Sequence, residues 1–213
     1  MTTILIVRHG FSESNKLKTF TGHIDAPLSD VGVEQARLTC NYISENYAVD
    51  KVYSSDLSRA VNTLKPLADA LGVEIIKEKG LREIYGGKWE GVAFDKLPKL
   101  FPEDYKVWQE NVGIARCTGG ESYPESQKRV VETLYKIAQQ EEGNTIAVAT
   151  HGGLIRGLEC YLLGIPLEEM SKTSYVQNAS ISVIVYDGEK FALKERDIVK
   201  HLNGLCTAMG KGI

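Results

Sequence analysis

Two histidines in this 213-residue chain stand in the same local setting, after an apolar run and directly before glycine. His9 follows ILIV and Arg8, and His151 follows the apolar run that begins at Ile146. An imidazole can act as a nucleophile or carry a proton near neutral pH, and a cation beside it disfavours its protonated form. A lone histidine at the end of a strand is more often structural. The repetition of the setting in a chain with only four histidines favours a shared functional site.

Alternating strands and helices must position these residues. Apolar runs predict strands at about 3–8, 51–54, 74–76, 145–150, 180–186 and 190–195, and helical spacing predicts helices over 33–47, 57–71, 125–140 and 154–163. This order predicts a three-layer α/β/α sandwich with a mainly parallel sheet. Asp187-Gly188 predicts a hairpin, and with it an antiparallel edge strand. The expected helix N-caps are Ser29, Ser55-Asp56 and Ser122.

The carboxyl ends of parallel strands meet at one edge of a sheet, so His9 and His151 can face each other there if their strands are neighbours. Arg59 lies one turn into the helix after strand 51–54, which brings it to the same edge, although an arginine at a helix start is commonly just solvated. Gly152 opens the helix after His151, where backbone N–H groups are expected to point at an anion and the glycine allows close approach. With Arg8, this set is typical of a phosphate-binding site.

Glu83 precedes a stretch, about 84–123, that fits the alternation poorly. The stretch is interpreted as an insertion of short helices over one end of the sheet, within a single domain of residues 1–213. Alone, Glu83 would be a surface carboxylate. Beside a phosphate site it can serve as a proton donor.

Composition excludes several kinds of partner. The formal net charge is −3, and lysine and arginine form no long run, so neither nucleic acid nor an acidic membrane surface is expected. No apolar run reaches transmembrane length, and the N-terminus has no signal-peptide core. The four cysteines lie far apart, which predicts free thiols and a cytoplasmic protein. They are Cys40, Cys117, Cys160 and Cys206.

Six segments resemble the histidine phosphatase superfamily, the phosphoglycerate mutase-like group. In order along roughly residues 4–186, they are RHGFSESN, GHIDAPLSDVGVEQA, SSDLSRAVNT, LREIYGGKWEGV, GGES and ATHGG. The resemblance implies a phosphoglycerate mutase-like fold and a phosphohistidine on His9. It also implies Glu83 as proton donor, and neither a metal nor another cofactor. The residues implied to bind and stabilise the phosphoryl group are Arg8, Asn15, Arg59 and His151.

The segment after Glu83 favours the phosphatase branch of this family over its mutases. Mutases have a basic residue soon after this glutamate, whereas this chain has Ile84-Tyr85-Gly86, and the insertion is shorter. REIYGGKWEG resembles broad-specificity and α-ribazole-phosphate phosphatases. The expected activity is metal-independent, acid-phosphatase-type hydrolysis of small phosphomonoesters. A phosphoglycerate mutase and a non-catalytic binding module on the same fold remain alternatives.

Other enzyme classes fit less well. A metal hydrolase would show further ligands at the strand ends, but the remaining histidines are His23 and His201. No cysteine has an arginine six residues later, which excludes a cysteine phosphatase. A serine-hydrolase elbow fails at Ser14, and GLCTAMGKGI has the wrong spacing for a P-loop.

A few loop residues have two interpretations. Substrate contact or an ordinary loop position is open for His23, Arg82 and Arg116. A pocket wall or a small core of the insertion is open for Tyr85, Trp89 and Trp108.

Overall fold

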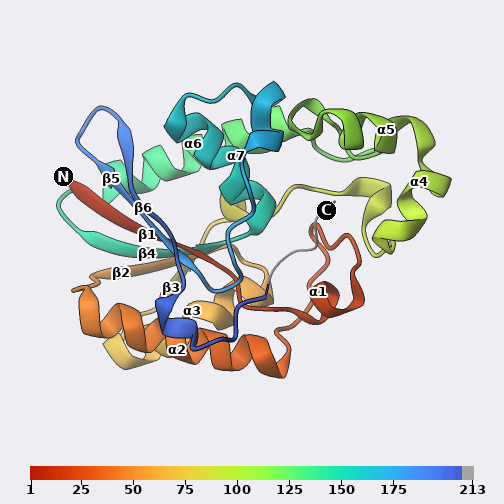
Figure 1. The fold of residues 1–213 in the computed structure, drawn as a ribbon. Helices are drawn as coiled ribbons and strands as arrows, with labels where there is room; N and C mark the ends of the chain where they lie inside the picture. The colour runs from red at the N-terminus through yellow and green to blue at the C-terminus, as the bar shows by residue number, and fades with distance from the viewer. Residues whose placement is uncertain (208–213) are drawn as a thin grey trace.

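The computed structural model describes residues 1–207, which form a six-stranded sheet of order β3-β2-β4-β1-β5-β6 flanked by helices (Figure 1). The end of the GLCTAMGKGI segment, residues 208–213, lies outside the described residues. All six predicted strands form close to their expected bounds. They are β1 (Thr2–Arg8), β2 (Lys51–Ser54), β3 (Ile75–Lys77), β4 (Thr145–Thr150), β5 (Ile181–Tyr186) and β6 (Phe191–Ile198).

The sheet is parallel from β3 through β2 and β4 to β1. β5 runs antiparallel to β1, and β6 runs antiparallel to β5. The predicted antiparallel component is therefore confirmed, although the strand that runs against the others is β5, one position in from the edge. The hairpin turn is stabilised as expected: Gly188 has φ 110°, and the Asp187 carboxylate accepts the N–H groups of Glu189 and Lys190.

Helices cover both faces of the sheet (Figure 1). One buried cluster joins Leu5 of β1 to Ile43 and Leu64 from the helices on that face, and a second joins Ile4 to Leu134 on the other. Successive β1 residues thus serve opposite cores, which is why the strand lacks polar alternation. The covering helices are α2 (Asp30–Asn46) and α3 (Ser58–Leu71) on one face, and α6 (Tyr123–Gln140) and α7 (Gly152–Leu163) on the other.

Two of the three expected helix caps form. The Ser29 hydroxyl accepts the Gly32 N–H at the start of α2, and the Ser122 N–H donates to Glu125 at the start of α6. The expected cap at Ser55-Asp56 is wrong, because α3 begins at Ser58 with Leu57 as its N-cap residue. Both polar side chains are used elsewhere, Ser55 by His151 and Asp56 by Arg82.

The stretch between β3 and α6 folds into short helical turns, including α4 (Leu97–Leu100) and α5 (Pro102–Glu110), as predicted. In Figure 1 this yellow-green segment lies at the end of the sheet where β1 and β4 finish. Its own core forms around the fully buried Trp89, which packs edge-on against Phe20 and Trp108. Trp89 therefore belongs to the core of the insertion.

None of the helices within residues 1–207 combines the length and apolar character needed to cross a lipid bilayer.

Candidate active site

The two strand-end histidines meet at the carboxyl edge of the sheet. β1 and β4 are direct neighbours with Arg8 opposite Thr150, and the His9 N–H donates to the Thr150 carbonyl at 2.9 Å. The ring centroids of His9 and His151 are 5.1 Å apart. The predicted juxtaposition of the two imidazoles is confirmed.

The contacts of His9 define its tautomer. Nδ1 lies 2.7 Å from the Gly10 carbonyl, which can only accept, so Nδ1 carries the hydrogen and the lone pair is on Nε2. Burial, reinforced by Arg59 and Arg8, lowers the pKa of His9 well below its usual value. The ring is therefore neutral near pH 7, with Nε2 able to attack an electrophile.

His151 is in contact with a hydroxyl group. Its Nε2 lies 2.8 Å from Ser55 Oγ, and a hydroxyl can either donate to a ring nitrogen or accept from it. Burial and the adjacent Arg59 lower the pKa of His151 well below its usual value, so this ring is also neutral. Among the described residues, the buried Nδ1 of His151 has no hydrogen-bond partner.

Arg8 and Arg59 are almost fully buried, at 2% and 1% exposure. Arg8 Nη1 donates to the Val176 carbonyl, and the Arg59 guanidinium donates to the carbonyls of Gly22 and Ile24. Burial lowers the pKa of Arg59 to about 10, which leaves it charged at neutral pH. Within the part of the chain that the structure describes, both Nε atoms are buried without a partner. Buried donors of this kind call for an acceptor, and they belong to the same site as the His151 Nδ1.

The glycines beside the histidines are needed for space. None of Gly10, Gly152 and Gly153 has a positive φ, so backbone freedom is not their role here. A Cβ on Gly152 would lie 2.9 Å from Arg8 Nε, and one on Gly153 would lie 2.7 Å from a Glu83 oxygen. The close approach they permit is to neighbouring protein groups.

Glu83 occupies the N-terminus of α7. Its Oε2 accepts the Gly153 N–H at 3.0 Å, and its Oε1 accepts the N–H groups of Leu154 and Ile84. The anion predicted at this helix terminus is therefore supplied in large part by the protein itself. Within residues 1–207, Gly152 has the one N–H of the expected set that is left for a ligand. Since each carboxylate oxygen offers two lone-pair positions, the position on Glu83 that no described residue fills is on Oε2.

Asn15 combines a cap with a place in the site. Its Oδ1 accepts the N–H and hydroxyl of Ser12 in a capping box that opens the short helix α1 (Glu13–Leu17). This leaves the amide nitrogen, the group that could donate to a phosphate, on a side chain that lines the cavity. Ser12 is fully buried and acts as the cap that turn chemistry favours.

These residues line a cavity that is open to solvent, with about 680 Å³ of empty space when the adjoining solvent is included. Arg8, His9 and Arg59 form its polar end with Glu83, whereas His151 lies beside His9 and is not part of the lining among the described residues. Sequence reasoning missed much of the wall, because it comes from segments without a recognisable pattern. The additional lining residues include Lys18, Thr19, Phe20, Thr21, Gly22, Phe94, Tyr123 and Tyr175, together with Trp108, for which a wall position was one of two interpretations.

The loop residues with two interpretations also find their places. Arg82 forms a bidentate ion pair with Asp56, and the exposed Arg116 pairs with Glu125. His23 Nε2 donates to the Glu83 carbonyl at 2.8 Å, and its ring lies against Tyr85. In the described structure, the cavity lining does not include His23, Arg82, Arg116 or Tyr85. Residues 1–207 contain no group of three or more histidine, cysteine, aspartate or glutamate side chains arranged to hold a metal ion.

Comparisons with known proteins find relatives that match nearly the whole chain. The model of the histidine phosphatase superfamily (branch 1) matches residues 4–198. The chain is 33% identical over 202 residues to phosphoglycerate mutase-like protein 4 of Arabidopsis thaliana, covering 93% of this chain and 86% of that one. It is 31% identical to phosphoserine phosphatase 1 of Hydrogenobacter thermophilus, over 100% of both chains. The solved structure of YhfR from Bacillus stearothermophilus matches with a TM-score of 0.90 and 26% identity, covering 95% of this chain and 100% of that one.

Proposed function

The chain belongs to the histidine phosphatase superfamily (branch 1), and we propose that its site hydrolyses small phosphomonoesters through a phosphohistidine on His9. The observation that carries the proposal is a set of three buried nitrogens without partners in the described residues, around a neutral His9. They are Arg8 Nε, Arg59 Nε and His151 Nδ1. A phosphoryl group brings several acceptor oxygens, and positive or N–H groups around them stabilise its transfer.

The first step transfers the phosphoryl group to His9. The lone pair of Nε2 forms the N–P bond as the ester P–O bond breaks, and that electron pair goes to the leaving oxygen. Glu83 Oε2 gives its proton to this oxygen, so the product leaves as an alcohol. In the proposed state the Ser55 hydroxyl donates to His151 Nε2, which leaves the hydrogen of this neutral ring on Nδ1. Arg8, Arg59 and this N–H stabilise charge on the remaining phosphoryl oxygens, with the amides of Asn15 and Gly152 as further donors.

The second step returns the enzyme to its starting state. Water attacks phosphorus and gives a proton to the Glu83 carboxylate, while the N–P bond breaks and its electron pair returns to Nε2. Inorganic phosphate leaves, so the sum of the two steps is ester plus water to alcohol plus phosphate. No step is routed through a metal ion, and undiminished turnover in a chelator is the expected result.

Trapping the intermediate tests this proposal. Brief incubation with a labelled aryl phosphate should leave acid-labile, base-stable label on the wild-type protein and none on His9→Ala. Glu83→Gln should accumulate more label than the wild type, because its second step lacks a base for water. Full turnover by a folded His9→Ala variant would overturn the proposal.

The nature of the alcohol is a further part of the proposal. One relative is named a phosphoserine phosphatase and another is named mutase-like, so phosphoserine and 3-phosphoglycerate are the first substrates to test. Phosphate release favours the hydrolase, and isomerisation of 3-phosphoglycerate in the presence of a bisphosphate primer would favour the mutase. The absence of a basic side chain at 84–86 supports hydrolysis.

We also propose that the protein works in the cytoplasm as a single domain. All four cysteines are free thiols in the structure, which suits a reducing compartment. The core of the insertion continues into α6 and α7 through Tyr123 and Cys160, which supports one folding unit.

A further inference from the structure

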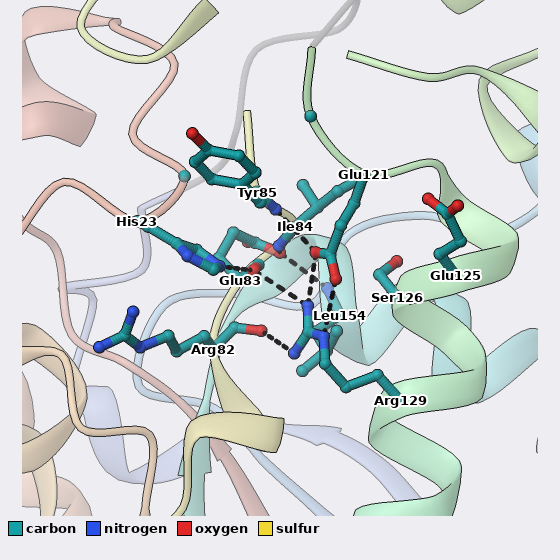
Figure 2. Close-up of polar contacts among 12 residues, drawn as sticks. His23, Arg82, Glu83, Ile84, Tyr85, Glu121, Glu125, Ser126, Arg129 and Leu154 are labelled. Atoms are coloured by element: carbon teal, nitrogen blue, oxygen red, sulfur yellow. Dashed lines mark hydrogen bonds and ion pairs between the residues drawn. The ribbon is translucent and has the colours of Figure 1, made fainter. Parts of the chain in front are cut away.

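An arginine on α6 forms hydrogen bonds to the backbone segment that carries Glu83. Arg129 uses all five of its N–H donors: Nη1 donates to the carbonyls of Gly80 and Arg82, and Nη2 donates to the carbonyl of Glu83 at 3.2 Å. Its remaining donors, from Nε and Nη2, form a bidentate pair with the Glu121 carboxylate at 2.9 and 2.7 Å. Figure 2 shows the Arg129 guanidinium between Glu121 and the 82–83 backbone.

Glu121 connects this arginine to the other side of the Glu83 peptide. Besides pairing with Arg129, its Oε2 accepts the Tyr85 N–H at 2.8 Å. Burial acts to raise the pKa of Glu121, but the Arg129 hydrogen bonds and the Tyr85 N–H outweigh it and the net pKa is lowered, which keeps the pair charged. Both side chains of the pair are only 23% exposed, so solvent screens them less than a surface pair.

His23 holds the same carbonyl from the opposite direction. Its Nε2 donates to the Glu83 oxygen at 2.8 Å, while its own N–H donates to Glu90. The Glu83 carbonyl thus accepts from two side chains that come from different parts of the chain, as the dashed contacts in Figure 2 show. Arginine is suited to this role because its planar fork fixes several acceptors at once, which a lysine cannot do.

We propose that Arg129, held by Glu121, is a positioning residue for proton donation by Glu83. The Glu83 carboxylate must place Oε2 against the leaving oxygen, and the tip is already fixed by three N–H donors. Arg129 and His23 fix the backbone end of the same side chain. Proton transfer depends on hydrogen-bond reach, and a misplacement of about 1 Å can reduce a rate about 100-fold.

The inference rests on the proposed role of Glu83, and leaving-group dependence separates it from a general structural effect. An aryl phosphate whose leaving group departs as a stable anion needs little proton donation, whereas an alkyl phosphate such as phosphoserine needs it fully. In Arg129→Lys, kcat/KM for phosphoserine is expected to fall about 10- to 100-fold, with less than a threefold change for the aryl phosphate. A merely structural defect would lower both equally.

Two further variants test whether the effect is specific to the contact between Arg129 and the Glu83 backbone. Glu121→Gln loosens Arg129 without removing it and should show the same selective loss, to a smaller degree. Arg116→Lys alters another arginine–glutamate pair, with Glu125 of α6. It should leave kcat/KM unchanged for both substrates, because Arg116 donates to no carbonyl of residues 80–83. Thermal melting of each variant establishes that it is folded.

A double-mutant cycle completes the test. In a Glu83→Gln background, Arg129→Lys should cause no additional loss with phosphoserine, since the group it positions is gone. Multiplicative losses, or equal losses on both substrates, would overturn the inference while leaving Glu83 as proton donor. If Glu83→Gln alone spares phosphoserine turnover, the proposed function of Glu83 fails instead, and the two failures are thus distinguished.

Discussion

Adding one methyl group at Gly152 should disable the site while leaving the protein folded. The new Cβ would lie 2.9 Å from Arg8 Nε and 3.0 Å from its Cζ, about 0.5–1 Å closer than an ordinary contact. The Arg8 guanidinium must move, and its bond to the Val176 carbonyl must weaken. Overpacking costs about 1–3 kcal/mol, partly offset by up to about 1 kcal/mol from replacing a helical glycine.

The catalytic effect should be much larger than the effect on stability. Loss of one preorganised donor to a developing anion costs about 10²–10³ in rate, equivalent to about 2.7–4 kcal/mol. We therefore expect Gly152→Ala to lower kcat/KM for an aryl phosphate about 100-fold or more. Its free energy of unfolding in urea should stay within about 2 kcal/mol of the wild type.

Gly157→Ala, in the same helix, is the matched control. A Cβ there would meet its nearest neighbours at 3.8 Å, an ordinary contact, so this variant should gain about 1 kcal/mol of stability and keep its activity. A folded Gly152→Ala protein with kcat/KM within threefold of the wild type would refute the conclusion that Gly152 makes room for Arg8.

Three further predictions follow from the site. Because burial depresses the pKa of His151, the unfolded state takes up its proton first as the pH falls below about 6.5, and this destabilises the fold. His151→Asn should therefore reduce the slope of unfolding free energy between pH 6 and 5 by up to about 1.4 kcal/mol per pH unit, as measured by urea unfolding. Equal slopes would show that the imidazole is not buried neutral. Ser55→Ala removes the hydroxyl that contacts His151 Nε2 and that, in the proposed mechanism, keeps the hydrogen of this ring on Nδ1, so it should lower kcat about 10-fold or more. Ser58→Ala, outside the site, should not lower kcat. Arg59→Lys keeps a positive charge but loses the planar guanidinium, which can form two parallel hydrogen bonds to a phosphate. It should raise the inhibition constant of inorganic phosphate, a competitive inhibitor, by about 10-fold or more.

The sequence allowed good prediction wherever local pattern determines position. The six strands follow from short apolar runs, and the meeting of His9 with His151 follows from the shared edge of parallel strands. Chain direction, rather than a contact between side chains, carries that prediction. Arg59 was placed by the same reasoning, one turn into the helix after β2.

Contacts that depend on packing between distant segments could not be predicted in the same way. Tyr175 reaches the cavity from a segment before β5 that has no periodicity. Ser55 was a plausible helix cap, and only the arrival of His151 on the neighbouring strand shows its other role. Arg129 looks like one more charged residue on an amphipathic helix until residues 80–83 are placed against it.

At Glu83, a contact between distant segments changes the mechanism that the sequence suggested. The sequence suggested that the start of α7 would meet a bound anion, but the amides of Gly153 and Leu154 are bonded to the Glu83 carboxylate. In the proposed mechanism, charge on the phosphoryl group is therefore met mainly by the guanidinium groups of Arg8 and Arg59 and by the His151 imidazole. The helix terminus instead holds the proposed proton donor, because its N–H groups donate to the Glu83 carboxylate. That carboxylate is the form needed to activate water in the second step, so one contact serves both halves of the proposed reaction.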